Sequence, residues 1–182
     1  MRLRRLEDEF TGAIRLEFRS FLLRPTPGAI PRDLGKFREY TKSWMRPAAD
    51  DDAPEFRVWA TEEGPPSHSV PPHLVAKAAA ELGDAAFHAM HDRLLRAYFS
   101  ENRDISRPDT LAALWNECGL DPQGFARAAD RDVLEKVIQE HNEATEIGVN
   151  GVPAVRIEGN DAAAVGAQPL EVYRRWFRKL LD

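Results

Sequence analysis

The single cysteine, Cys118, carries the strongest nucleophile among the side chains of this 182-residue chain. Thiol–disulfide exchange within one polypeptide needs two cysteines, because the first attacks the substrate disulfide and the second releases the mixed disulfide. Cys118 also lies at helical spacing from Leu111, Leu114 and Trp115, and this apolar stripe favours a buried, unreactive thiol. We therefore assign no catalytic residue from the sequence.

The five histidines could bind a metal ion or transfer protons near neutral pH. His88, His91 and Asp92 share part of one helix surface. A zinc pair on a helix has the spacing i, i+4, with a catalytic Glu and a further ligand, and His88 and His91 have neither. His68 and His73 fall in a proline-rich connector, and we leave their role open. The sequence predicts no metal site and no cofactor.

Charge and composition exclude several other functions. The formal net charge of -5 gives no overall basic field for nucleic acid or an anionic membrane surface. The longest apolar runs are a few residues, far below the ~20 needed to span a bilayer. Acidic residues 7–9 follow the basic start, where an export signal would be apolar. With one cysteine, these features predict a cytoplasmic protein without a disulfide framework. The aspartates at 50–52 are interpreted as a solvated turn.

The first third of the chain mixes helix and strand patterns. Leu3, Leu6 and Phe10 have helical spacing, and residues 14–19 alternate apolar and charged side chains as a half-buried strand does. Prolines and glycine mark residues 22–33 as a loop. The apolar spacing predicts a helix over 34–44, and residues 55–60 a short strand or extended segment.

The rest of the chain divides into a helical unit and a short tail. From residue 72 to 148 the pattern is helical almost throughout, with Asp84 and Asp121 as expected N-caps. In the tail, residues 152–157 and 165–167 are typical of strands and 170–181 of an amphipathic helix.

Four sequence segments carry a resemblance to a known family. They are Ala97-Tyr98-Phe99-Ser100-Glu101-Asn102-Arg103-Asp104-Ile105, Cys118-Gly119-Leu120, Gly148-Val149-Asn150-Gly151-Val152-Pro153 and Gly166-Ala167-Gln168-Pro169. The chain resembles the DsbA-like thioredoxin-fold proteins, and within them the FrnE-like dithiol-disulfide isomerase branch. The 2-hydroxychromene-2-carboxylate isomerases form a neighbouring branch.

The resemblance implies an α/β fold, with a thioredoxin-like core formed by residues 1–65 and 148–182 and an all-helical insertion at 66–147. It implies a cis Val152–Pro153 peptide bond, with Val152 and Pro153 as the substrate-binding residues. A cis proline has no N–H, and the backbone of Val152 is then free to pair with an extended polypeptide substrate. A proline that opens a strand in trans is the alternative that the residues alone favour.

The family's chemistry belongs to a Cys-x-x-Cys pair after the first strand, at the start of the first helix. Neither this pair nor a sequence that matches this strand is present, so two open sheet edges are expected. We expect an N-terminally truncated or redox-inactive relative of thiol-disulfide oxidoreductases. The alternatives are a non-catalytic polypeptide-binding module and a glutathione-dependent isomerase of the neighbouring branch. The partners implied are a polypeptide or a small thiol such as glutathione, and a homodimer could fill the gap.

Overall fold

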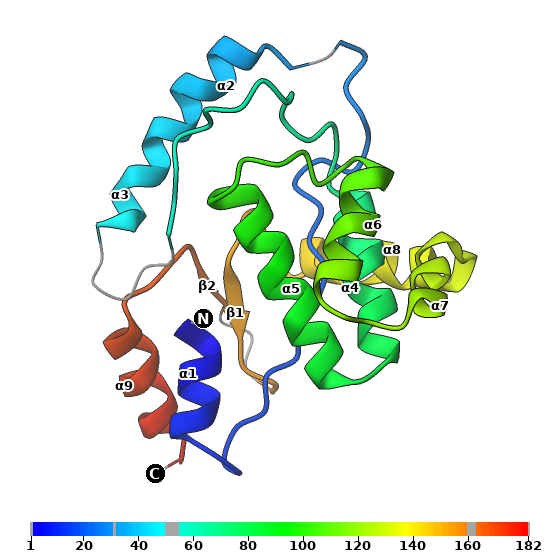
Figure 1. Cartoon of the computed structure of the whole chain (residues 1–182). Coiled ribbons are helices and arrows are strands. Elements are labelled where there is room, and N and C mark those ends of the chain that lie inside the picture. Colours follow the sequence, from blue (N-terminus) through cyan, green and yellow to red (C-terminus); the bar gives the residue numbers. More distant parts are fainter. Residues whose placement is uncertain (1, 31, 50–54, 160–162, 182) are drawn as a thin grey trace.

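The computed structural model describes residues 2–30, 32–49, 55–159 and 163–181. It is mostly helical, with one small antiparallel sheet near the C-terminus (Figure 1). None of its described helices is long and apolar enough to cross a membrane. The helices of this part of the chain are α1 (Arg2–Glu9), α2 (Leu34–Thr41), α3 (Met45–Ala48), α4 (Val70–Glu81), α5 (Asp84–Phe99), α6 (Pro108–Glu117), α7 (Pro122–Phe125), α8 (Arg131–Glu146) and α9 (Leu170–Leu181). The strands are β1 (Ala154–Arg156) and β2 (Ala163–Val165).

Helices α4 to α8 form a helical unit with its own apolar core. Met90 of α5 and Leu114 and Trp115 of α6 are fully buried in that core. The indole N–H of Trp115 donates to the Asp121 carbonyl at 3.0 Å. The Asp121 side chain caps α7 by accepting a hydrogen bond from the Gln123 backbone N–H. The predicted cap at Asp121 is therefore confirmed, and it holds α7 next to the buried tryptophan.

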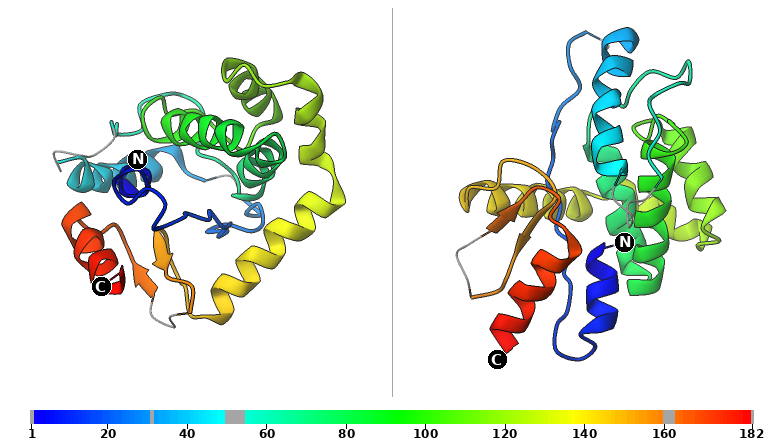
Figure 2. Two further views of the ribbon diagram at one scale, coloured as in Figure 1. Left: turned by 90° about the horizontal axis from the view of Figure 1, so that it is seen from below. Right: turned by 90° about the vertical axis from the view of Figure 1, so that its left-hand side faces the viewer.

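The two ends of the chain build a second core together. Leu6 of α1 packs in one cluster with Val155 of β1 and with Tyr173 and Phe177 of α9. Figures 1 and 2 show α1 and α9 side by side. Strand β1 pairs antiparallel with β2, with Val155 opposite Ala164. The apolar faces of α1, α9 and the sheet therefore bury one another.

A third core lies where α2 meets the end of α5. It contains Phe37, Trp44 and Trp59, which are all buried. The chain that leads into it is held by Asn102, whose side-chain oxygen accepts a hydrogen bond from the Ala60 backbone N–H at 3.0 Å. Asn102 has a positive φ of 56°, a conformation that Asn tolerates better than most residues.

The helices follow the sequence pattern closely, but the predicted strand at 14–19 is wrong. That segment is extended and half-buried on alternate residues, yet it joins no sheet. A strand is defined by backbone hydrogen bonds to a neighbouring strand, and residues 14–19 have none among the described residues. The alternation of apolar side chains therefore correctly predicted which side chains of residues 14–19 are half-buried, but it wrongly predicted that the segment pairs with another strand.

Smaller differences concern element ends. The segment 55–60 forms no strand, which agrees with the extended alternative predicted for it. Strand β2 begins two residues before the predicted 165–167. Helix α5 begins at Asp84, and the N-cap is Gly83 with a φ of 111°, so the predicted cap at Asp84 is one residue late. The aspartates at 50–52 lie outside the described residues.

Candidate functional site

The loop between α8 and β1 holds the two predicted substrate-binding residues. The Val152–Pro153 peptide bond is cis, and the Val152 side chain is 49% exposed. The carbonyl of Pro153 accepts a hydrogen bond from the Gly166 backbone N–H at 2.8 Å. This bond fastens the loop to the residue after β2, so the small sheet fixes the position of the loop.

The backbone of Val152 is unpartnered within the described part of the chain. Neither its N–H nor its C=O has a hydrogen-bond partner among the residues that the structure describes. An extended polypeptide binds through such alternating backbone donors and acceptors. The geometry therefore suits the backbone of a second chain, and the exposed Val152 side chain adds an apolar contact.

Cys118 lies in another part of the molecule. It caps the C-terminus of α6 and packs against the core of the helical unit, whereas β1 belongs to the core formed by the chain ends. Burial raises the pKa of its thiol above the ordinary value, against the opposing effect of Arg93. A helix C-terminus further disfavours an anion. Cys118 is therefore poorly placed to act as a thiolate nucleophile.

Three of the histidines, His88, His91 and His141, pack against the aromatic rings of Phe18, Phe21 or Phe87. The ring of His91 stacks on Phe87 with centroids 5.5 Å apart and contacts Phe18 at 5.1 Å. Burial lowers the pKa of both His73 and His91 to about 4. Among the described residues, no group of three or more His, Cys, Asp or Glu side chains is arranged to hold a metal ion.

Sequence reasoning missed a buried ion pair between α4 and α8. The Lys77 ammonium lies 2.6 Å from Glu140, and each side chain is about nine-tenths buried. Lys77 also donates to the Phe18 carbonyl at 3.1 Å, and Glu140 accepts from the Ser20 N–H at 2.6 Å. Glu140 follows Val137 by three positions on one helix face, but that spacing alone does not name its partner.

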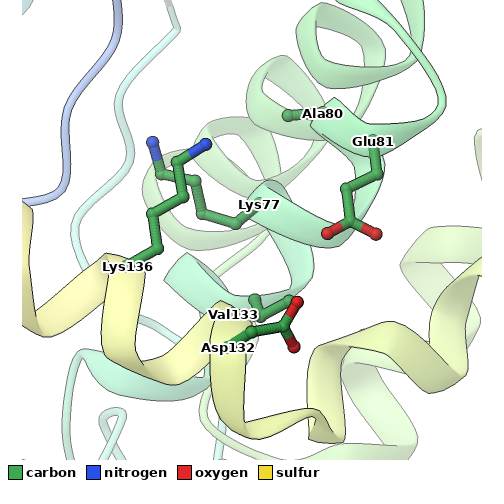
Figure 3. Close-up of a pocket in the computed structure, with 6 residues that line it drawn as sticks. All are labelled: Lys77, Ala80, Glu81, Asp132, Val133 and Lys136. Carbon is green, nitrogen blue, oxygen red and sulfur yellow. The ribbon is translucent and has the colours of Figure 1, made fainter.

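Lys77 also lines a hollow of about 310 Å³ between α4 and α8 (Figure 3). The amino groups of Lys77 and Lys136 point to one end, and the carboxylates of Glu81 and Asp132 lie at the other. Both carboxylates pair with Arg127, at 2.7 and 2.8 Å. Because most of these charges are satisfied within the chain, the hollow is a weaker candidate for binding than the Val152–Pro153 loop.

A second hollow, of about 490 Å³, opens between the 22–27 loop and α8. It is lined mainly by apolar side chains, including Leu22, Leu134 and Ile138, with His68 and His141 at its wall. His68 bonds to the Ser67 hydroxyl at 2.8 Å, and the ring nitrogen Nδ1 of His141 accepts from the Leu22 N–H at 3.2 Å. Both histidines therefore have structural partners.

Comparison with known proteins agrees with the fold. The family model of the DsbA-like thioredoxin domain matches residues 1–177. No curated protein matches the chain. A candidate protein disulfide isomerase from Nitrosomonas europaea superposes with a TM-score of 0.79 at 16% identity, covering 99% of this chain and 88% of that chain.

Two further solved structures are of the cytosolic disulfide reductase DsbM from Pseudomonas aeruginosa. One has a TM-score of 0.74 at 20% identity, and the other, with glutathione, a TM-score of 0.74 at 19% identity. Both comparisons cover 99% of this chain and 90% of that chain. At this level of identity, the likeness shows the thioredoxin-like fold. Because the family model spans nearly the whole sequence, the chain belongs to the DsbA-like thioredoxin domain family.

Proposed function

We propose that these 182 residues form a polypeptide-binding member of the thiol-disulfide oxidoreductase family that has no dithiol exchange activity of its own. The observation that carries the proposal is the backbone of Val152, which has no hydrogen-bond partner among the described residues and stands beside an exposed apolar side chain. The lack of dithiol exchange activity is supported by the single, partly buried Cys118, because these 182 residues contain no second thiol that could resolve a mixed disulfide.

Several features favour the FrnE-like branch and a cytoplasmic location. The sequence segments 97–105 and 148–153 carry the resemblance to that branch. A chain with one cysteine suits a reducing compartment, and the DsbM neighbours are described as cytosolic. We infer that the bound polypeptide is extended and presents its backbone to Val152.

Glutathione is a second candidate ligand at the same loop. One DsbM structure contains it, and glutathione is a short peptide with backbone donors and acceptors of its own. In this chain it would bind non-covalently at Val152, because Cys118 lies elsewhere. Glutathione would then compete with a polypeptide for the loop.

The binding test compares two substitutions at one position. Val152→Pro removes the backbone N–H, whereas Val152→Ala keeps it and shortens the side chain. The probe is fluorescently labelled α-lactalbumin, reduced and carboxymethylated so that it stays unfolded and cannot form disulfides. We expect the wild type and V152A to bind it with dissociation constants within about threefold of each other, and V152P to bind about tenfold more weakly.

Circular dichroism and thermal unfolding check that both variants fold. Equal binding by V152P and V152A, with both folded, would remove the Val152 backbone from the proposal. Millimolar glutathione added to the wild type then tests the second candidate, and unchanged probe binding would exclude glutathione from this loop.

A further inference from the structure

Arg24 and Arg32 lie near the two ends of the loop that leads to α2 (Figure 1). Arg24 is exposed and Arg32 is half-buried, and neither guanidinium forms an ion pair with a carboxylate among the described residues. Every other half-buried arginine side chain that the structure describes does pair with a carboxylate. These are Arg4, Arg38, Arg93, Arg103, Arg127 and Arg174. Arg32 is therefore the exception in how this chain treats its half-buried arginines.

Arg32 is held by two aromatic side chains. Its guanidinium lies over the ring of Phe37, 4.2 Å from the ring centroid, and it donates a hydrogen bond to the hydroxyl oxygen of Tyr98. Phe37 and Tyr98 both pack against Trp44, in the core where α2 meets the end of α5. Because the N–H groups of arginine lie in the guanidinium plane, stacking by the face leaves several of them for another acceptor.

Tyr98 also keeps a donor for such an acceptor. Burial raises the pKa of its phenol to about 12, so the hydroxyl stays protonated at neutral pH. Its oxygen accepts from Arg32, and its own O–H proton is then available to a further acceptor.

Arg24 brings a second positive charge to the same place. Its backbone is fixed to the start of α4, because its N–H donates to the Ser69 hydroxyl at 3.0 Å and its C=O accepts from the Ser69 N–H at 2.8 Å. Burial first, and then the charge of Arg24, lower the pKa of the Arg32 guanidinium. The two like charges thus repel each other, and a bound anion would relieve this repulsion.

The carboxylate next to Arg32 in the sequence is used elsewhere. Asp33 caps α2, where its Oδ1 accepts from the Lys36 N–H at 2.7 Å. Tyr40 stacks on Phe37, with ring centroids 5.9 Å apart, and is 58% exposed. An aromatic surface therefore adjoins the two cations.

We propose that Arg24, Arg32 and the Tyr98 hydroxyl bind the phosphate group of a small organic phosphomonoester. Near neutral pH such a group carries close to two negative charges, because its second pKa is about 6, and its three terminal oxygens are strong acceptors. It therefore matches two guanidinium groups and one phenol, whereas a carboxylate would compensate only one of the charges. The exposed ring of Tyr40 contacts the organic part. None of these residues belongs to the Val152–Pro153 loop, so the inference does not rest on the proposed function.

The test uses phenyl phosphate as the probe, with inorganic phosphate and succinate as comparisons, in isothermal titration calorimetry near pH 8. Arg24→Gln and Arg32→Gln each remove one charge from the site. Arg175→Gln is the matched control, because it removes an equal charge from an exposed position on α9. Tyr98→Phe removes only the hydroxyl. Circular dichroism checks that each variant folds, and Arg24 is exposed, so R24Q tests the site even where R32Q disturbs the core around Phe37.

We expect R24Q and R32Q to bind phenyl phosphate at least about tenfold more weakly than the wild type, and Y98F about threefold more weakly. R175Q and V152P should bind it within about twofold of the wild type. Tighter binding of phenyl phosphate than of inorganic phosphate supports an organic phosphate, and the reverse supports free phosphate as the source of the same group. Succinate should bind more weakly than either.

Three results would overturn the proposal. The first is no binding of phenyl phosphate or inorganic phosphate to the wild type at millimolar concentration. The second is a loss of affinity in R175Q as large as that in R24Q, which would show a response to net charge alone. The third is succinate binding as tight as that of phenyl phosphate, which would show that the site does not select a phosphate group.

Discussion

The Lys77 ammonium of α4 lies 2.6 Å from the Glu140 carboxylate of α8, and both side chains are almost fully buried. The same two residues reach the extended segment, through the Phe18 carbonyl and the Ser20 N–H. One ion pair therefore joins two helices and the extended segment that follows the N-terminal helix α1. Its energetics can be measured.

Removing one partner should destabilise the fold strongly. Lys77→Met leaves a buried carboxylate without its cation, and we expect the free energy of unfolding to fall by about 3–5 kcal/mol. Glu140→Gln keeps an oxygen acceptor for the Ser20 N–H but leaves the buried ammonium unpaired. The double variant K77M/E140Q buries no charge, so it should be more stable than either single variant. Urea denaturation of the four proteins measures the coupling, and additive losses would contradict it.

Acidification should destabilise the protein before its carboxylates titrate. Burial holds the pKa of His73 and His91 at about 4 in the folded state, whereas both are ordinary histidines when unfolded. Below about pH 6.5 the unfolded chain binds protons that the folded chain excludes, so stability falls as pH falls from about 6.5 to 4. The loss should reach about 1 kcal/mol or more per histidine by pH 5.

The measurement is the urea midpoint at pH 7.5 and at pH 5. The double variant His73→Gln, His91→Gln should show a smaller change between the two pH values, whatever its stability at pH 7.5. The same pH dependence in the wild type and the double variant would assign it to other groups.

Asn102 should be more sensitive to Ala than to Gly. Its side-chain oxygen accepts from the Ala60 N–H, and its backbone has a φ of 56°. Asn102→Gly loses the side-chain bond but adopts the conformation freely, which should cost about 1–2 kcal/mol. Asn102→Ala adds the strain of a positive φ, about 1–2 kcal/mol more. Thermal unfolding checks this order. Equal stability of the N102G and N102A variants would show that the positive φ at position 102 costs alanine no extra strain.

Cys118 should have no part in redox turnover. In insulin reduction by dithiothreitol, the protein should give no acceleration over buffer, and Cys118→Ser should behave identically. Its thiol should also react with a disulfide reagent at neutral pH more slowly than free cysteine does, because burial raises its pKa. Insulin turnover that C118S abolishes would contradict the assignment of Cys118 as a structural residue.

The amino-acid pattern was sufficient for the helices. The helical pattern over 72–148 and 170–181 agrees with the region that forms α4 to α9, because a helix is set by residues three and four positions apart. The cap at Asp121 was equally local. The resemblance carried by segments 97–105 and 148–153 led to the thioredoxin-like family, which the family model confirms over residues 1–177.

The sequence failed where the outcome depended on distant parts of the chain. Residues 14–19 have the alternation of a strand, but pairing requires a neighbour, and local pattern does not supply one. Three of the partners that hold this segment and its continuation to Leu22 are Lys77, Glu140 and His141, more than fifty residues away.

The sequence by itself determined the helical periodicity, the single thiol and the absence of a second one to resolve a mixed disulfide. Only the tertiary structure decided that Lys77 meets Glu140 and that burial lowers the pKa of His73 and His91. The physical reason is that periodicity depends on neighbours in the chain, whereas burial of charge and backbone pairing depend on which elements meet in space.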